Sequence, residues 1–278
     1  MPELPEVECV RRGLLRSLPG QEIATARVLW PGSVATHTPE AFAELVRGAR
    51  WGVPDRRGKY LILPVPPRCL VVHLRMTGRR FAAPHRDDEW EYHPHTRLIL
   101  EHTDGSRLYL RDIRKFARVY LVEDPLSVVG ALGPEPLAED LTAEVFDALL
   151  SRHRRQIKPL LLDQHVIAGL GNIYADESLW VAGIHPLRSS DSLSALERVR
   201  LYKAIRNVLS QAIVDGGSTI RDYHGADDRR GSHQQVLAVY GRRGRPCPRC
   251  GSEIIRSVVA QRGTHWCPTC QPLPGLQP

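Results

Sequence analysis

Four of the chain's six cysteines form two close pairs, Cys247 with Cys250 and Cys267 with Cys270, separated by sixteen residues. At this spacing, four thiolates can converge on one Zn²⁺ ion from the two ends of a β-hairpin. Two disulfides are a poor alternative in a cytosolic chain, and a redox motif would not need to be duplicated. Because only thiolates are offered, no position is left for a catalytic water, and the pattern predicts one structural zinc.

An arginine, Arg262, lies at the expected tip of this hairpin, within the segment Val259–Trp266. It could bind a phosphate, or it could be a solvated turn residue. The whole chain of 278 residues carries a net charge of +7, and nearly all of its positive charge is arginine, which favours a polyanionic partner. Aromatic residues make up only 6%, which argues against a surface that stacks single-stranded bases, so duplex nucleic acid is the better expectation.

Three acidic residues, Glu3, Glu6 and Glu8, mark the start of the chain. They fall in or near the first turn of a helix that is predicted from Leu4 to Leu18, because apolar residues recur there at intervals of three and four. Acidic side chains suit the positive end of a helix dipole, and proline is tolerated in the first turn. On these residues alone, a well-capped helix start is the simplest interpretation.

The elements that must position these residues divide into a β-rich half and a helical half. Short β-like runs separated by Gly, Pro and Asp favour an antiparallel sandwich, at Ile23–Leu29, Tyr60–Val65, Leu70–Leu74, Arg97–Glu101, Arg107–Leu110 and Ala117–Val122. The glycines and prolines of Gly130–Pro136 then indicate a hinge. Beyond it a polar loop, Gly216–His233, follows four predicted helices, at Ala143–Ser151, Ile157–Asp163, Ile173–Val181 and Ser194–Ile213.

Membrane insertion and secretion are both disfavoured. No apolar run approaches the roughly 18 residues that a bilayer-spanning helix needs, which excludes a membrane protein. The N-terminal residues are acidic and contain prolines, unlike the basic and then apolar start of a signal peptide. We therefore expect a cytosolic protein.

Four segments, in order along the chain, resemble those of the formamidopyrimidine-DNA glycosylases: Pro2–Glu8, Arg57–Leu61, Gly169–Tyr174 and the four-cysteine hairpin with Gln261–Thr264. The resemblance implies an α+β protein of two domains, in which an N-terminal helix and antiparallel β-sandwich precede a helix-two-turn-helix domain that ends in a β-hairpin zinc finger. The expected limits are 1–130 for the catalytic domain, 131–138 for the hinge, 139–241 for the helix-two-turn-helix domain with its lesion-capping loop, and 242–271 for the zinc finger.

The resemblance also implies a function. The protein would be a bacterial base-excision repair enzyme, a monomer in the cytosol or nucleoid. It would remove oxidised purines, such as 8-oxoguanine and formamidopyrimidines, from double-stranded DNA and then cleave the abasic site by β,δ-elimination.

By this resemblance, the nucleophile is the secondary amine of Pro2, exposed once the initiator methionine is removed. An α-amine has a pKa of about 8, so part of it is neutral at pH 7, and its attack at C1′ leaves an iminium that eases phosphate elimination. Glu3 would protonate the sugar ring, and Glu6 would be an auxiliary carboxylate or, alternatively, only a partner of the helix dipole. Lys59 would contact the phosphate beside the lesion and support β-elimination, while Arg262 would grip the flanking phosphates and assist δ-elimination.

Further residues are expected to bind DNA or to fill the gap left by the extruded base. Asn172 lies in a glycine-rich turn that opens a helix, where free backbone N–H groups attract phosphate. The positive run upstream of this turn would lie on the same face or, alternatively, be a solvated surface. Core packing is the alternative for the methionine and phenylalanine of the gap-filling set. The DNA-binding candidates are Asn172, His153, Arg154, Lys158, His95 and the gap-filling residues Met76, Arg114 and Phe116.

The chain departs from the family pattern in places. Arg75 stands where glycine is usual, and Asp112–Phe116 reads Asp-Ile-Arg-Lys-Phe in place of Asp-Pro-Arg-Arg-Phe. In the capping loop, 225–233, Gly231–His233 replaces the Gly-Tyr-Phe of some members, so the resemblance implies the chemistry more closely than the lesion range. One alternative is a related glycosylase that prefers oxidised pyrimidines, which usually begins Pro-Glu-Gly-Pro where this chain has Leu4. Another is a non-catalytic zinc-finger protein that binds damaged DNA, against which the presence of the catalytic residues counts.

Overall fold

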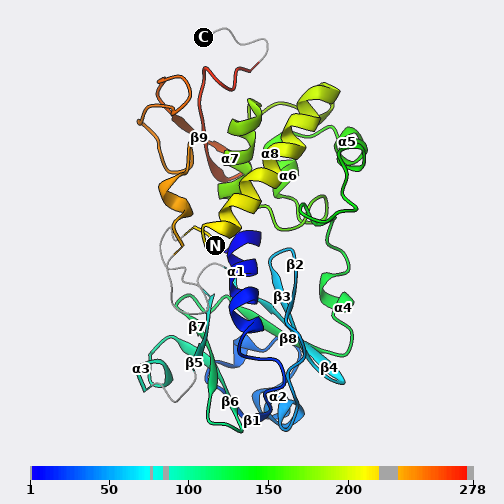
Figure 1. Cartoon of the computed structure of the whole chain (residues 1–278), viewed down its shortest axis with the longest axis vertical. Helices are drawn as coiled ribbons and strands as arrows, with labels where there is room; N and C mark the ends of the chain where they lie inside the picture. The colour runs from blue at the N-terminus through cyan, green and yellow to red at the C-terminus, as the bar shows by residue number, and fades with distance from the viewer. Residues whose placement is uncertain (1, 76–77, 84–87, 219–230, 274–278) are drawn as a thin grey trace. The chain divides into compact units, whose positions relative to one another are not determined.

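A computed structural model describes residues 2–75, 78–83, 88–218 and 231–273 (Figure 1). The chain forms two compact units. The first unit comprises Met1–Ala131 and Asp215–Gln234, and the second comprises Leu132–Val214 and Gln235–Pro278. The segment Asp215–Gln234 therefore belongs to the first unit, although residues of the second unit flank it in the sequence.

The first unit contains two four-stranded antiparallel sheets, with strand orders β1-β6-β7-β5 and β2-β3-β4-β8. The strands of the first sheet are β1 (Ile23–Val28), β5 (Gly78–Ala83), β6 (Thr96–His102) and β7 (Arg107–Asp112). Those of the second are β2 (Asp55–Arg57), β3 (Tyr60–Val65), β4 (Arg68–His73) and β8 (Arg118–Val122). The helical elements are α1 (Leu4–Leu15), η1 (Pro31–Ser33), α2 (Pro39–Val46), α3 (Asp88–Glu91) and α4 (Leu126–Val129).

One apolar core joins the two sheets to helix α1. Alternate residues of β3 face inward, and Val7, Val10 and Leu14 of α1 are buried in the same cluster, as the spacing of three and four requires. In Figure 1, α1 runs between the β2-β3-β4-β8 sheet and the strands β7, β5 and β6. The predicted α+β class and the sandwich with its N-terminal helix are confirmed, although the helix ends at Leu15 instead of Leu18.

The second unit is helical and ends in a two-stranded hairpin. Helix α7 packs against α6, α8 and β10, so it connects the helices to the hairpin. The elements are α5 (Ala143–Ser151), α6 (Ile157–Leu162), α7 (Asn172–Ala182), η2 (Ser190–Ser192), α8 (Ala195–Val214), η3 (His233–Gln235, shared with the first unit), β9 (Ile255–Val259) and β10 (Arg262–Trp266). No helix in the described ranges combines the length and apolar character needed to cross a bilayer.

Candidate active site and zinc hairpin

The start of α1 brings together the three residues predicted for the chemistry at the N-terminus. Pro2 is buried, and Glu3 and Glu6 are only 2% and 1% exposed. Glu3 is the N-cap, and its side chain accepts from the backbone of Glu6, while the Glu3 N–H donates to Glu6 Oε2 at 2.8 Å. This reciprocal capping box satisfies two helix-end donors and fixes the orientation of the Glu3 carboxylate.

The second oxygen of the Glu6 carboxylate binds a distant part of the chain. Glu6 Oε1 accepts from the backbone N–H of Ser218 at 2.8 Å. The neighbouring Gly217 has φ +82°, and a Cβ there would lie 3.0 Å from the same oxygen. Both the positive φ and the lack of space for a side chain therefore favour glycine at this position. Because both Glu6 oxygens accept backbone hydrogen bonds, this geometry favours a positioning role for Glu6.

Lys59 lies in the two-residue connection between β2 and β3, because Arg57 pairs with Tyr60. The first residue of that connection, Gly58, has φ +56°, as a tight hairpin turn with glycine in first place requires. Arg56 ties the turn to α1, since its guanidinium donates to the Gly58 carbonyl at 3.0 Å and to Glu8 at 3.3 Å. The Lys59 side chain is buried in this setting.

Glu8 carries the ionic contacts between α1 and this turn. It accepts from Arg11 and Arg12 at 2.8 Å and from Arg56 at 3.3 Å. Burial alone would raise the pKa of Glu8, but the hydrogen bonds from Arg11 and Arg12 and the nearby positive charges outweigh it and lower the pKa to about 2. Glu8 therefore remains ionised well below neutral pH.

His73, which sequence analysis did not select, lies beside the Lys59 turn. It pairs across the sheet with Tyr60, their ring centroids are 4.5 Å apart, and its Nδ1 accepts from the Arg75 N–H at 2.9 Å. Burial, followed by the positive charges of Arg75 and Lys59, lowers the pKa of His73 to about 3. The imidazole is thus neutral at pH 7. The sequence signal that could have identified His73 is its position as a polar residue near the end of the predicted apolar strand Leu70–Leu74.

Three of the predicted gap-filling and DNA-contact residues of the first unit lie in or beside the β7–β8 connection: Arg114, Phe116 and His95. Arg114 and Phe116 are exposed in that connection, with the guanidinium 4.8 Å from the ring centroid. His95 lies beside it, because its carbonyl accepts from the Asp112 N–H at 2.8 Å. Met76 and residues 225–230 of the capping loop lie outside the described residues.

In the second unit, the N-terminus of α7 holds the hairpin next to Arg262. Asn172 Nδ2 donates to the Gly263 carbonyl at 2.8 Å. Val259 pairs with Arg262, so Ala260 and Gln261 alone form the turn, and Arg262 is exposed at its end. The two predicted phosphate ligands, Asn172 and Arg262, are therefore brought together.

Lys158 does not have the exposure expected of a DNA contact. Its side chain is 0% exposed, and Nζ lies 2.6 Å from Asp176 Oδ1, 2.7 Å from Thr264 Oγ1 and 3.2 Å from the Gly263 carbonyl. Asp176 also accepts from the His265 N–H at 2.9 Å. The ammonium is thus enclosed by an internal network, and the expectation of a direct DNA contact is corrected to a link between α6, α7 and the hairpin.

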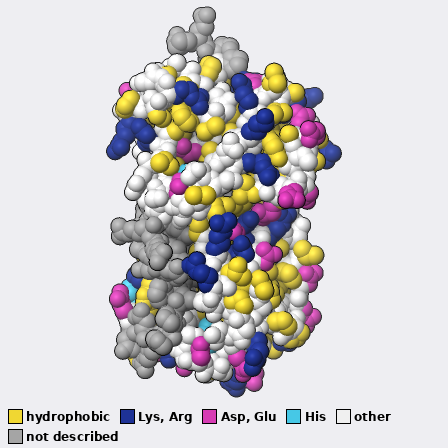
Figure 2. Space-filling view, in the orientation of Figure 1, with side chains coloured by type: hydrophobic (Ala, Val, Ile, Leu, Met, Phe, Trp, Pro, Cys, Tyr) yellow, Lys and Arg dark blue, Asp and Glu magenta, His cyan; other side chains and the backbone are white. Residues whose placement is uncertain are grey.

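His153 and Arg154 lie between α5 and α6, and they differ in exposure. His153 is half-buried, whereas the Arg154 side chain is 89% exposed and 3.6 Å from Asp191. Lys and Arg side chains are visible over both units in Figure 2, with acidic side chains among them. Arg154 is therefore well placed to meet a phosphate from solvent.

The four cysteine thiols converge at the base of the hairpin. All four sulfurs lie within 4.8 Å of one another, with 3.9 Å between Cys247 and Cys270 and 3.4 Å between Cys250 and Cys267. A tetrahedron with Zn–S bonds of about 2.3 Å has sulfur–sulfur edges of about 3.8 Å. The cluster fits one structural zinc ion, and no ligand position remains for a substrate.

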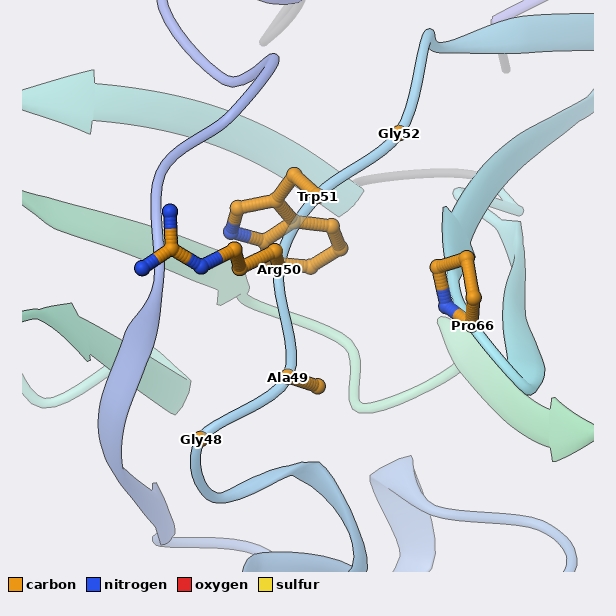
Figure 3. Close-up of a pocket in the computed structure, with 6 residues that line it drawn as sticks. All are labelled: Gly48, Ala49, Arg50, Trp51, Gly52 and Pro66. Atoms are coloured by element: carbon orange, nitrogen blue, oxygen red, sulfur yellow. The ribbon is translucent and has the colours of Figure 1, made fainter.

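A separate pocket in the first unit lies apart from these residues. It has a volume of about 440 Å³ and is lined by Gly48–Gly52 and Pro66 (Figure 3). Arg50, its one charged lining residue, is paired with Glu22 at 2.8 Å. The lining includes none of the predicted site residues.

Three family models match consecutive parts of the chain. The formamidopyrimidine-DNA glycosylase N-terminal domain matches residues 1–119, the H2TH domain of the same glycosylases matches 132–224, and the zinc finger found in FPG and IleRS matches 244–273. The chain belongs to the formamidopyrimidine-DNA glycosylase family. Similar family members include formamidopyrimidine-DNA glycosylases of Herpetosiphon aurantiacus, 48% identical over 98% of this chain and 100% of that one, and of Enterococcus faecalis, 43% identical over 99% of each.

Solved structures of formamidopyrimidine-DNA glycosylases share the fold over nearly the whole chain. Lactococcus lactis Fpg in complex with DNA containing an abasic site has a TM-score of 0.90 at 38% identity, covering 98% of this chain and 100% of that one. MutM in complex with DNA containing carbocyclic 8-oxo-G has a TM-score of 0.89 at 38% identity, with the same coverage. A Lactococcus lactis complex with Fapy-dG DNA has a TM-score of 0.89 at 37% identity, again over 98% and 100%.

Proposed function

We propose that this formamidopyrimidine-DNA glycosylase excises oxidised purines from duplex DNA and cleaves the resulting abasic site. The observation that carries the proposal is the start of α1, where Pro2 and Glu3 lie together and Glu6 fixes the Glu3 backbone through a 2.8 Å hydrogen bond. The relatives in complex with abasic-site, Fapy-dG and 8-oxo-G DNA support the substrate class.

The proposed chemistry uses one covalent intermediate. The Pro2 amine attacks C1′, the bond to the base breaks, and Glu3 delivers a proton to the sugar oxygen as the ring opens. The resulting iminium acidifies the C2′ proton, so the 3′ phosphate leaves by β-elimination and the 5′ phosphate follows by δ-elimination. Lys59 supports the first elimination and Arg262 the second, each through a phosphate. Bound zinc supplies folding energy to the hairpin that carries Arg262.

The remaining contacts follow from exposure and position. Asn172, Arg154 and His153 bind backbone phosphates, and His95 lies against DNA beside the β7–β8 connection. Arg114, Phe116 and Met76 fill the gap left by the extruded base. The domain limits 1–130, 131–138, 139–241 and 242–271 belong to the same proposal. We further propose a monomer that acts in the bacterial cytosol and nucleoid, since the relatives are bacterial and act on DNA.

Borohydride trapping on a duplex with a single 8-oxoguanine tests this function. A covalent protein–DNA adduct with the expected strand break supports it, because only an amine nucleophile gives a reducible imine. The control is the same protein with an uncleaved N-terminal extension, which blocks the Pro2 amine and should form no adduct.

A parallel duplex that carries an oxidised pyrimidine discriminates the substrate classes. Faster trapping on the duplex with the oxidised pyrimidine would assign the protein to the related glycosylases that prefer oxidised pyrimidines. Tight binding of both duplexes without any adduct or strand break would indicate a non-catalytic protein that binds damaged DNA.

A further inference from the structure

The connection between β7 and β8 exposes two large apolar side chains. Ile113 is 41% exposed and Phe116 is 44% exposed, and the Arg114 guanidinium lies over the Phe116 ring. Under the proposed function, Arg114 and Phe116 enter the base stack. A loop that enters a stack gains from being ordered beforehand, because the ordering cost is then not paid at insertion.

Both ends of this connection are held by one buried carboxylate. Asp112 is 1% exposed, and its two oxygens accept from the Arg114 N–H at 3.2 Å and the Ala117 N–H at 2.7 Å. Lys115 lies between these anchors with φ +60°, a conformation that costs free energy for a residue with a Cβ. A contact made by the Lys115 side chain can offset this local cost.

That contact is an aromatic ring from the segment that follows β1. Lys115 Nζ lies 4.0 Å from the centroid of the Trp30 ring, which is within cation–π range. Lys115 thus reaches out of the connection to a separate element of the same unit.

The Trp30 ring is itself held in place. The Leu29 and Trp30 N–H groups donate to the Arg97 carbonyl at 2.8 and 3.2 Å, and the Ala35 N–H donates to the Val119 carbonyl of β8 at 2.8 Å. The indole packs against the backbone of Gly32, because a Cβ on Gly32 would lie 2.8 Å from Trp30 Nε1. Trp30 is 36% exposed, and it is held beside the connection by these backbone hydrogen bonds and by the Gly32 contact.

We propose that Trp30 and Lys115 form a cation–π clamp that positions the β7–β8 connection for insertion into DNA. Both are positioning residues, acting through Arg114 and Phe116. The proposal rests on the proposed function, since it concerns the step in which the lesion base leaves the stack.

Five variants test the clamp. Lys115→Met and Trp30→Leu each remove one partner, Lys115→Arg keeps a cation, and Gly32→Ala displaces the indole without touching Lys115. Lys115→Gly also removes the ammonium but suits the positive φ, so its melting temperature should not fall. The matched charge control is Arg47→Met, because Arg47 is an exposed cation of the same unit paired only at the surface with Glu44 at 3.0 Å.

The measurement is single-turnover excision of 8-oxoguanine beside cleavage of a preformed abasic site. Extrusion is followed separately by the fluorescence of 2-aminopurine next to the lesion, which needs no chemistry. Each clamp-breaking variant should slow extrusion and excision by about two- to fivefold, the factor of one exposed cation–π contact, and abasic cleavage should change less because no base has to leave the stack. Lys115→Arg and Arg47→Met should match the wild type.

Unchanged extrusion in Lys115→Met, Lys115→Gly and Trp30→Leu would overturn the clamp. Equal slowing by Arg47→Met would overturn it too, by making loss of positive charge the cause. If the wild type extrudes 2-aminopurine but neither excises nor cleaves, the proposed catalysis fails while the clamp is still tested by the fluorescence.

Discussion

Glu3 is both the N-cap of α1 and the proposed catalytic acid. Glu3→Gln keeps an oxygen that can accept from the Glu6 backbone but removes the acid, so the helix start should survive. Excision of 8-oxoguanine should fall by about 10²- to 10⁴-fold, the usual contribution of general acid–base catalysis. Cleavage of a preformed abasic site, which already offers an aldehyde to Pro2, should fall much less. Single-turnover rates on both substrates measure this, and equal losses with intact DNA binding would assign Glu3 to a step that both share.

Lys158 and Asp176 form a buried ion pair in which each charge is compensated by the other. Both side chains are 0% exposed, so Lys158→Met leaves a buried carboxylate without its cation and should cost about 3–5 kcal/mol of unfolding free energy. Adding Asp176→Asn should recover part of that loss, because the amide oxygen can still accept from His265. Urea unfolding measures the three proteins, with Arg154→Met as the exposed-charge control, expected within about 0.5 kcal/mol of wild type. A loss for Lys158→Met as small as that of the control would show that the pair contributes little.

His73 predicts a pH dependence of stability. Its folded pKa of about 3 lies below the unfolded value of 6.5, so between these values the unfolded chain binds a proton that the folded chain does not. Stability from this group is fully present above pH 6.5 and falls as the pH drops, by at most about 1.4 kcal/mol per pH unit. His73→Asn, whose side-chain oxygen can still accept from Arg75, should flatten the decline.

The comparison is best made by urea unfolding between pH 6.5 and 5. Glu8 does not interfere there, because its pKa falls from 4.5 to about 2 on folding and its contribution is lost only below pH 4.5. The other histidines are common to both proteins and cancel. Parallel stability curves would show that His73 is not held neutral by its surroundings.

At the scale of elements, the β9–β10 turn carries avoidable strain. Ala260 and Gln261 have φ +45° and +61°, the pattern of a type I′ turn, which favours Asn-Gly. Ala260→Asn with Gln261→Gly should therefore raise the unfolding free energy by about 1 kcal/mol or more while DNA affinity is kept, since Arg262 is unchanged. Hydrogen exchange of the hairpin amides measures the gain, and Ala260→Val should have the opposite effect. Faster exchange in the Asn-Gly variant would contradict the turn assignment.

Local patterns predicted many of the elements, and contacts distant in sequence decided what the elements do. The apolar spacing of α1 and the strand alternation of β3 were sufficient to predict those elements, and the cysteine spacing predicted the hairpin. Helix α2 was missed, although Thr38 and Pro39 at its start are capping signals. The burial of Lys158 could not be foreseen, because a lysine in a positive run is indistinguishable from a surface residue until Asp176 and Thr264 are placed beside it. The Glu6–Ser218 contact could not be predicted from the sequence either, since no local pattern joins the two segments.

At the scale of the whole molecule, removal of zinc should separate binding from bulk folding. We expect the hairpin beyond Tyr240 to need the metal held by its four thiolates in addition to its contacts with Asn172 and Lys158, whereas Glu177 holds the backbone N–H groups of Ala238, Val239 and Tyr240 at 2.8–2.9 Å without metal. Chelation should therefore abolish duplex binding through loss of Arg262 positioning, while far-UV circular dichroism changes little. Elemental analysis should find one zinc per chain in active protein, and full binding by zinc-free protein would refute the assignment. Restored binding on adding zinc back is the control for irreversible damage.

The membership of Asp215–Gln234 in the first unit bears on the order in which the protein is made. A ribosome completes the strands and α1 long before it reaches Ser218, so a nascent chain has Glu6 without the hydrogen bond that its second oxygen accepts in the finished protein. The last part of the first unit to assemble is thus the start of α1 around Glu6, where the proposed nucleophile Pro2 lies. A chain truncated after the hinge would carry Pro2 and Glu3 but not their complete setting, which ties a competent site to synthesis of most of the polypeptide.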